Sequence, residues 1–286
     1  MGNQWIKAYR DGRWTSIKCP TGETKIFSMT IGPVLAQKWL EQNNTCNRRL
    51  KPNQIKKITH DIQRGNWFDT ADYIAFYRDG QLHDGQNRLS AIVQAGRQIK
   101  TRVVFGIEPE AVKVSGTSKP RTLGDRVKLS GMNCDGRSLR AAKYILETMK
   151  GNYNVFDDEI VSFHNKYKDV LDKVCKVVNS RFFNKQPVQS AISLVAIQQK
   201  DRIDDIIEFA ERYNSGIGIK NEKSPAMKLR NLAMDQRKSN SGPWRKELFL
   251  KTLFACRAFL EGKTEIQRLD KAKDDTIFVD GFVLEF

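Results

Sequence analysis

The first part of the chain alternates apolar and polar residues, a spacing that predicts β-strands. Two runs rich in aromatic residues, 5–9 and 14–17, flank Asp11-Gly12. An Asp-Gly pair between two such runs is typical of a β-hairpin. We therefore expect a hairpin extension over residues 1–25, followed by a short strand over residues 26–31.

After residue 31 the apolar residues recur at the spacing of a helix, and two helices are predicted. The first predicted helix has Thr30 as a candidate N-cap and Pro33 in its first turn. Its predicted apolar face consists of Val34, Leu35, Trp39 and Leu40. A second helix is predicted to begin at Pro52 and to end at Gly65, and its apolar stripe consists of Ile55, Ile58 and Ile62.

Strands return after the second helix. The pattern predicts a strand over residues 73–77, a turn at Asp79-Gly80 and a short strand over 81–83. A helix over residues 86–95 and a strand over 100–106 complete the series. Because strands and helices alternate, we expect a small α/β domain over residues 26–128.

The second half of the chain has the periodicity of helices. Apolar stripes cover residues 139–149, 170–178 and 206–210, Ser224-Pro225 is a helix start signal, and residues 243–261 form a long amphipathic segment. We therefore expect a helical, basic domain over residues 129–286. The predicted fold class is α+β, with a small α/β domain followed by an all-α domain.

The charge of the chain indicates its class of partner. The sequence has 49 Lys and Arg against 33 Asp and Glu, a net charge of +16, and a pI near 9.7. Such an excess neutralises phosphates and releases counterions, so nucleic acid is the expected partner. The alternative is a generally basic surface without such a role.

Composition narrows the location and the chemistry. Mean hydropathy is −0.55, no apolar run approaches the roughly 18 residues of a membrane span, and residues 1–14 lack the apolar stretch of a secretory signal. We therefore expect a cytoplasmic protein without membrane contact. The odd number of scattered cysteines argues against a disulfide framework and a zinc site; they are Cys19, Cys46, Cys134, Cys175 and Cys256. Three separated histidines suggest no metal cluster.

One stretch predicts a phosphate site. In Asp84-Gly85-Gln86-Asn87-Arg88, a strand leads to a glycine and a helix begins at once. The free N–H groups and dipole of a helix N-terminus attract anions, and a glycine lets a phosphate approach the backbone. Arg88 would clamp phosphate oxygens, and Asp84 would cap the helix or hold a ligand hydroxyl or metal water. The competing interpretation is an ordinary turn and capped helix.

The same stretch, extended through Leu89-Ser90-Ala91, resembles the D-G-Q-H-R-L-x-A signature of the ParB/sulfiredoxin superfamily. It is closest to phage and bacterial ParB-like proteins, which are often found near DNA-modification systems. Weaker similarity extends over about residues 30–270. It includes Asn47-Arg48, the helix through Asp61 with Gly65-Asn66-Trp67, the segment 119–125, and residues 225–230 and 258–262.

The resemblance implies a nucleotide site. In that superfamily the strand–glycine–helix corner binds the phosphates of ATP or CTP. Carried over, Gly85, Gln86, Asn87 and Arg88 would form the phosphate cradle. Lys119 and Arg121 would add a second cationic contact, and Asn47 and Arg48 would lie at the mouth of the pocket. A phage-encoded chain would act in the host cytoplasm, and an oligomer is compatible with the resemblance.

Two departures from the family pattern bear on turnover. Asn87 replaces the usual His, and the run Ser115-Gly116-Thr117-Ser118 lacks the acid that the family carries for Mg²⁺. Gln86 stands where sulfiredoxins carry their reactive cysteine, which excludes peroxiredoxin repair. Asp61 and Asp72 are weak candidates, with Asp84, for a general base or metal ligand, although Asp61 also fits a solvated helix position. His83 fits a phosphate contact or a satisfied histidine at a strand end equally well.

A second set of residues is predicted to contact nucleic acid. Its members lie in the helical half: Arg230, Arg237, Lys238, Trp244, Arg245 and Lys246. Phe182 and Phe183 are further candidates for stacking on bases, although aromatic pairs at helix ends are more often core residues. The segment 186–202 is a candidate scaffold for a helix-turn-helix but carries no turn glycine, so no helix-turn-helix is predicted.

Three functions are compatible with these features. The first is a ParB-like enzyme that hydrolyses ATP or CTP, or transfers phosphate, while acting on DNA, as in phage DNA modification. The second is a non-catalytic DNA-binding or accessory protein of the same fold, which the missing acid near Gly116 favours. The third is a metal-dependent nuclease, for which the sequence shows no acid cluster.

Overall fold

The structure of the chain is a computed structural model that describes residues 5–10, 13–18, 24–45, 47–70, 72–113, 122–129, 131, 134–150, 155–219, 221–235 and 241–270. It divides into two compact units, residues 1–120 and 121–286. The expected fold class, α+β, is confirmed: strands and helices share the first unit, and the described part of the second is helical. The division lies a few residues before the expected boundary at 128.

The first unit begins with a hairpin of β1 (Trp5–Arg10) and β2 (Arg13–Lys18), which pair antiparallel. A separate four-stranded sheet has the order β3-β6-β4-β5. Its strands are β3 (Lys25–Ile31), β4 (Ile74–Tyr77), β5 (Leu82–Asp84) and β6 (Ile99–Ile107). β6 pairs antiparallel with β3 and parallel with β4, and β4 pairs antiparallel with β5. The sheet is therefore mixed.

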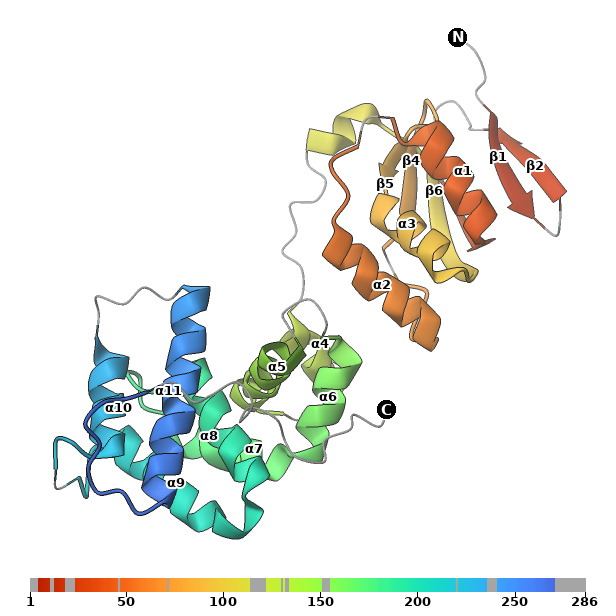
Figure 1. The fold of residues 1–286 in the computed structure, drawn as a ribbon. Helices are drawn as coiled ribbons and strands as arrows, with labels where there is room; N and C mark the ends of the chain where they lie inside the picture. Colours follow the sequence, from red (N-terminus) through yellow and green to blue (C-terminus); the bar gives the residue numbers. More distant parts are fainter. Residues whose placement is uncertain are drawn as a thin grey trace. The chain divides into compact units, whose positions relative to one another are not determined.

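Helices α1 (Pro33–Asn43), α2 (Pro52–Arg64) and α3 (Gln86–Ala95) share a hydrophobic core with this sheet, and α3 contacts both α1 and α2 (Figure 1). The core between them centres on aromatic rings. The Trp39 and Phe76 ring centroids are 5.0 Å apart, and Phe76 stacks on Phe105 at 5.1 Å. Leu89, Ala91 and Ile92 of α3 are buried in the same core, which holds α3, and therefore the turn at Gly85, against the sheet.

Two sequence predictions for α1 are wrong. Its N-cap is Gly32, not Thr30, which lies in β3. Val34 is 69% exposed and does not belong to the core face, which Leu35, Ala36 and Trp39 form. The strand therefore runs on to Ile31, and the helix begins too late for Thr30 to reach its free amides.

The second unit is built from helices. They are α4 (Leu123–Leu129), α5 (Gly136–Lys150), α6 (Asp157–Lys166), α7 (Lys168–Val177), α8 (Gln186–Gln198), α9 (Ile203–Ser215), α10 (Pro225–Met234) and α11 (Gly242–Leu260). α8 contacts α5, α7, α9 and α11, and Figure 1 shows it among them. Every residue from Pro187 to Ile197 is buried. Because α8 is enclosed along its length, it cannot enter a DNA groove as a recognition helix.

Two short 3-10 helices complete the described elements. The first, η1 (Pro109–Lys113), follows β6, and the second, η2 (Lys200–Arg202), leads into α9. Ser224 caps α10 by accepting a hydrogen bond from the Met227 amide at 3.3 Å, as the Ser-Pro signal predicted. No helix among the described residues has the length and apolar character needed to cross a membrane.

Candidate functional site

The predicted phosphate corner has the expected backbone, with β5, Gly85 and α3 in succession. Gly85 has φ +113°, a left-handed value that favours glycine. A Cβ at this position would lie 3.0 Å from Cγ1 and 3.2 Å from Cα of Ile74 in β4. The glycine is therefore required by close packing against the neighbouring strand, whether or not a phosphate binds.

The side chains of Gln86 and Asn87 hold a protein loop. Gln86 is 5% exposed, and its Nε2 donates to the Arg48 carbonyl oxygen at 2.8 Å. Asn87 is 7% exposed, and its Oδ1 accepts from the Lys51 amide at 3.1 Å. Its Nδ2 donates to Gln54 Oε1 at 3.2 Å. These amides fasten the segment before α2 to the first turn of α3, so in this structure they do not form a vacant cradle.

Arg88 also makes internal contacts. Its guanidinium donates to Asp84 Oδ2 at 3.0 Å and to the carbonyl oxygen of Asp72. The side chain is 13% exposed, whereas that of Asp84 is 57% exposed. Burial lowers the pKa of Arg88, and the carboxylates of Asp84 and Asp72 oppose that shift. The guanidinium remains charged, but Arg88 must leave this ion pair before it can clamp an incoming phosphate.

The backbone at the corner keeps one feature of an anion site. α3 has no side-chain cap, and Asp84 Oδ1 accepts from the Gly85 amide at 2.7 Å. The first intrahelical bond runs from the Leu89 amide to the Gly85 carbonyl oxygen, so the amides of residues 86–88 precede it. Gly85, Gln86 and Asn87 are all buried. The N-terminus of α3 is therefore uncapped but covered.

Exposed cations lie on the loop that covers this turn. Arg48, Arg49 and Lys51 are exposed, and within the described ranges none of them pairs with a carboxylate. Asn47 is half-buried, and its Nδ2 donates to the Leu82 carbonyl oxygen and to Asn44 Oδ1, each at 2.7 Å. The sequence placed Asn47 and Arg48 at a pocket mouth. In the structure Asn47 anchors the loop, whereas the three cations project from it.

The structure describes the remaining predicted site residues only in part. Lys119, Arg121 and the run 115–118 lie outside the described residues. Asp61 is half-buried on α2, and its carbonyl oxygen accepts from the Asn66 amide at 2.8 Å. The His83 ring packs edge-on against Tyr77, with centroids 4.7 Å apart.

The predicted nucleic-acid residues of the helical unit have different environments. Arg230 lies 4.0 Å from the Phe183 ring centroid and donates to the Tyr213 carbonyl oxygen, so it braces the interior. Lys246 is exposed and forms no ion pair with a carboxylate in the described part of the chain. Arg237 and Lys238 fall outside the described residues. Trp244 and Arg245 line a cavity.

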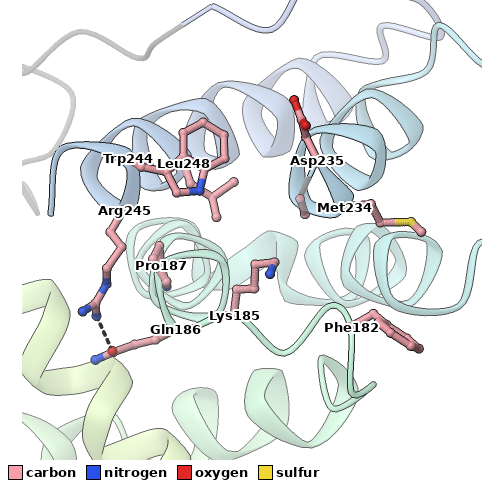
Figure 2. A pocket seen from close by; sticks show the side chains of 10 residues that line it. Phe182, Lys185, Gln186, Pro187, Met234, Asp235, Trp244, Arg245 and Leu248 are labelled. Atoms are coloured by element: carbon pink, nitrogen blue, oxygen red, sulfur yellow. Dashed lines mark hydrogen bonds between the residues drawn. The ribbon is translucent and has the colours of Figure 1, made fainter. Parts of the chain in front are cut away.

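That cavity, with a volume of about 480 Å³, lies between α8, α10 and α11. In Figure 2, Trp244 and Leu248 line one side, Met234 and Phe182 line the other, and Lys185 lies between them. The other lining residues are Gln186, Pro187, Ala233, Asp235 and Arg245. The sequence predicted Trp244 and Arg245 in one set of nucleic-acid contacts and Phe182 apart from them, but it gave no local pattern for Lys185 or Met234.

The two neighbouring phenylalanines have different roles. Phe182 is 67% exposed at the cavity, whereas Phe183 is buried in the core and packs against Tyr213 with ring centroids 5.4 Å apart. Only Phe182 is placed to contact a ligand. Arg245 lies 5.1 Å from the Tyr144 ring centroid and donates to Gln186 Oε1, so two neighbouring side chains fix its guanidinium.

Both units carry excess positive charge. Residues 1–120 contain 19 Lys and Arg against 10 Asp and Glu, and residues 121–286 contain 30 against 23. The excess is denser in the shorter α/β unit. Among the described residues, no group of three or more His, Cys, Asp or Glu side chains is arranged to hold a metal ion.

Comparison with protein-family models, with curated proteins and with solved structures finds no match for this chain.

Proposed function

We propose that this chain is a non-catalytic nucleic-acid-binding protein, with DNA as its expected partner and an α/β unit of the ParB/sulfiredoxin type. The proposal rests on exposed cations that form no ion pair with a carboxylate among the described residues. Both units have such cations, and the net charge of the chain is +16. Arg48, Arg49 and Lys51 belong to the first unit, and Arg181 and Lys246 to the second. Such cations are free to neutralise phosphates.

The closed corner favours binding over catalysis. Phosphoryl transfer depends on groups positioned around the reacting phosphate, usually with a metal ion. Here Arg88 is paired with Asp84, and Gln86 holds the Arg48 carbonyl oxygen. The binding hypothesis requires neither a free arginine clamp nor an acid near Gly116.

Fluorescence anisotropy of labelled DNA tests this proposal. We expect saturable binding by the full chain at low salt, and weaker binding by a triple variant, Arg48→Gln with Arg49→Gln and Lys51→Gln. Each lost phosphate contact should reduce the slope of log K against log salt by about 1. A matched control replaces three cations that already pair with carboxylates: Arg78, Arg126 and Lys263. Equal losses in both triple variants would contradict the assignment of the loop.

A second candidate function, nucleotide binding, is favoured by the uncapped N-terminus of α3 beside the three loop cations. It requires the Arg88–Asp84 ion pair to open. Asp84→Asn removes the charge that holds Arg88, so it should strengthen binding of ATP or CTP if Arg88 clamps the phosphates. Calorimetric titration with and without Mg²⁺, together with an assay of phosphate release, distinguishes this candidate. Unchanged, undetectable binding in both proteins would exclude it.

A further inference from the structure

The cavity of Figure 2 combines an apolar rim with positively charged groups. Its rim exposes large apolar side chains, with Phe182 at 67% and Met234 at 55% exposure, and half-buried Trp244 lies opposite. Single exposed apolar residues are common, but a cluster around a hollow marks a ligand or partner site. The cavity therefore offers flat apolar surface to a ligand.

The same cavity is electropositive on the side of α8 and α11. Both helices begin there with a proline in the first turn, without an acidic residue in that turn and without a side-chain cap. Their N-termini direct partial positive charge toward the cavity. Lys185 has no carboxylate partner among the described residues, and Arg245 is held in place by Gln186 and Tyr144.

One carboxylate, that of Asp235, lies at the opposite edge, at the C-cap of α10. A ligand that fits this arrangement has apolar faces for the aromatic rings, an edge with hydrogen-bond donors for Asp235, and an anionic group for Lys185 and Arg245. A nucleotide unit has all three. A volume of about 480 Å³ also falls within the usual range of small-ligand pockets.

We propose that this cavity binds one unstacked base of a nucleic-acid strand, with Phe182 and Trp244 against the base and Lys185 and Arg245 at the adjacent phosphate. The inference rests on the proposed function, since it presumes that the chain binds nucleic acid, and it narrows the substrate to single-stranded or locally unpaired strands. A base within a duplex is stacked on both faces and must be extruded before it can enter. Aromatic stacking accepts any base, so little sequence preference is expected.

The test uses the full chain and four probes: a labelled single-stranded oligonucleotide, the same strand with abasic residues, its duplex, and a strand containing 2-aminopurine. We expect the single strand to bind more tightly than the duplex and than the abasic strand. Quenching of 2-aminopurine fluorescence is expected on binding, because stacking on an aromatic ring quenches it.

Phe182→Ala should weaken binding of the base-containing strand about 5-fold or more. The matched control is Phe68→Ala, because Phe68 is 74% exposed and lies in the other unit; it should change binding less than 2-fold. Lys185→Gln is a second variant, expected to weaken binding of both the base-containing and the abasic strand.

The outcomes separate this inference from the proposed function. If the abasic strand binds as tightly as the base-containing strand, or if Phe182→Ala behaves like Phe68→Ala, the base pocket is wrong while nucleic-acid binding stands. A duplex that binds more tightly than the single strand has the same consequence. If no probe binds at low salt, both proposals fail.

Discussion

Gly85 shows how one residue can satisfy two explanations. A glycine between a strand and a helix suggests room for a phosphate, but here the missing Cβ makes room for Ile74, and φ is +113°. Both constraints act in the ligand-free protein. The sequence predicted that a glycine is needed at this turn, but its reason depends on β4, which only the fold places there.

Replacing Gly85 by Ala should therefore destabilise the protein. The left-handed backbone costs about 1–2 kcal/mol for a residue with a Cβ, and contact with the Ile74 backbone adds to it. We expect the free energy of unfolding, measured with urea, to fall by more than about 2 kcal/mol. Gly96→Ala is the control, because φ there is +64° with nothing within 4 Å of the added Cβ. A smaller loss for Gly85→Ala than for Gly96→Ala would contradict this explanation.

Two buried thiols give the protein a defined response to alkaline pH. Burial raises the pKa of Cys175 and of Cys256 to about 12, from an ordinary value of 9.0. In the unfolded chain these thiols lose their protons at lower pH than in the folded protein. The contribution of these thiols to the free energy of unfolding is therefore constant well below pH 9 and falls as the pH rises toward 12, by about 1.4 kcal/mol per pH unit for each thiol.

Cys256→Ala isolates one of these thiols. The variant is less stable at every pH because it leaves a cavity. Between about pH 9.5 and 10.5, above the ordinary thiol pKa, its free energy of unfolding should decline less steeply than that of the original chain. Urea unfolding curves at several pH values measure the two slopes. Parallel curves for the variant and the original chain would show that the thiol is not held protonated in the fold.

At the scale of elements, the first turn of α3 holds the loop before α2 in place by hydrogen bonds. Gln86 and Asn87 bind backbone and side-chain atoms that lie 33 to 38 positions away in the sequence. Spacing within the motif predicts a helix start, but it contains no information about such distant partners. For this reason the helix could be predicted from the sequence, whereas the role of its side chains could not.

Cleavage by trypsin can test whether these hydrogen bonds hold the loop, because Arg48, Arg49 and Lys51 are exposed on it. Asn87→Ala removes the bonds to the Lys51 amide and to Gln54, so cleavage in this loop should become faster under native conditions. Gln94→Ala is a suitable control, because Gln94 is exposed near the other end of α3. Equal cleavage rates in the two variants would mean that the loop is held by other contacts.

The helical unit was predictable in outline for a different reason. Its stripes of apolar residues recur at helical spacing, and proline or Ser-Pro marks the start of several helices. α8 carried no such stripe, because every residue from Pro187 to Ile197 is buried, including the polar Gln189, Ser190 and Ser193. A helix at the centre of a unit has no solvent-exposed face to reveal its period.

At the scale of the whole molecule, composition predicted the class of partner but not where contact occurs. The excess of Lys and Arg is spread over both units, yet Arg88 and Arg230 are engaged internally. A count of charges cannot separate such residues from exposed ones such as Arg49 or Lys246. The structure makes that separation. The proposal therefore depends on the loop cations and the cavity of Figure 2, and not on the corner at Gly85.

The salt dependence of the binding affinity tests most directly whether this protein binds nucleic acid through its exposed cations. The measurement is the anisotropy of a labelled single-stranded oligonucleotide titrated with the full chain over a series of salt concentrations. We predict saturable binding whose log K falls linearly with log salt, with a slope of about −0.7 for each phosphate neutralised. Absence of saturable binding at low salt, or an affinity that does not change with salt, would contradict the account.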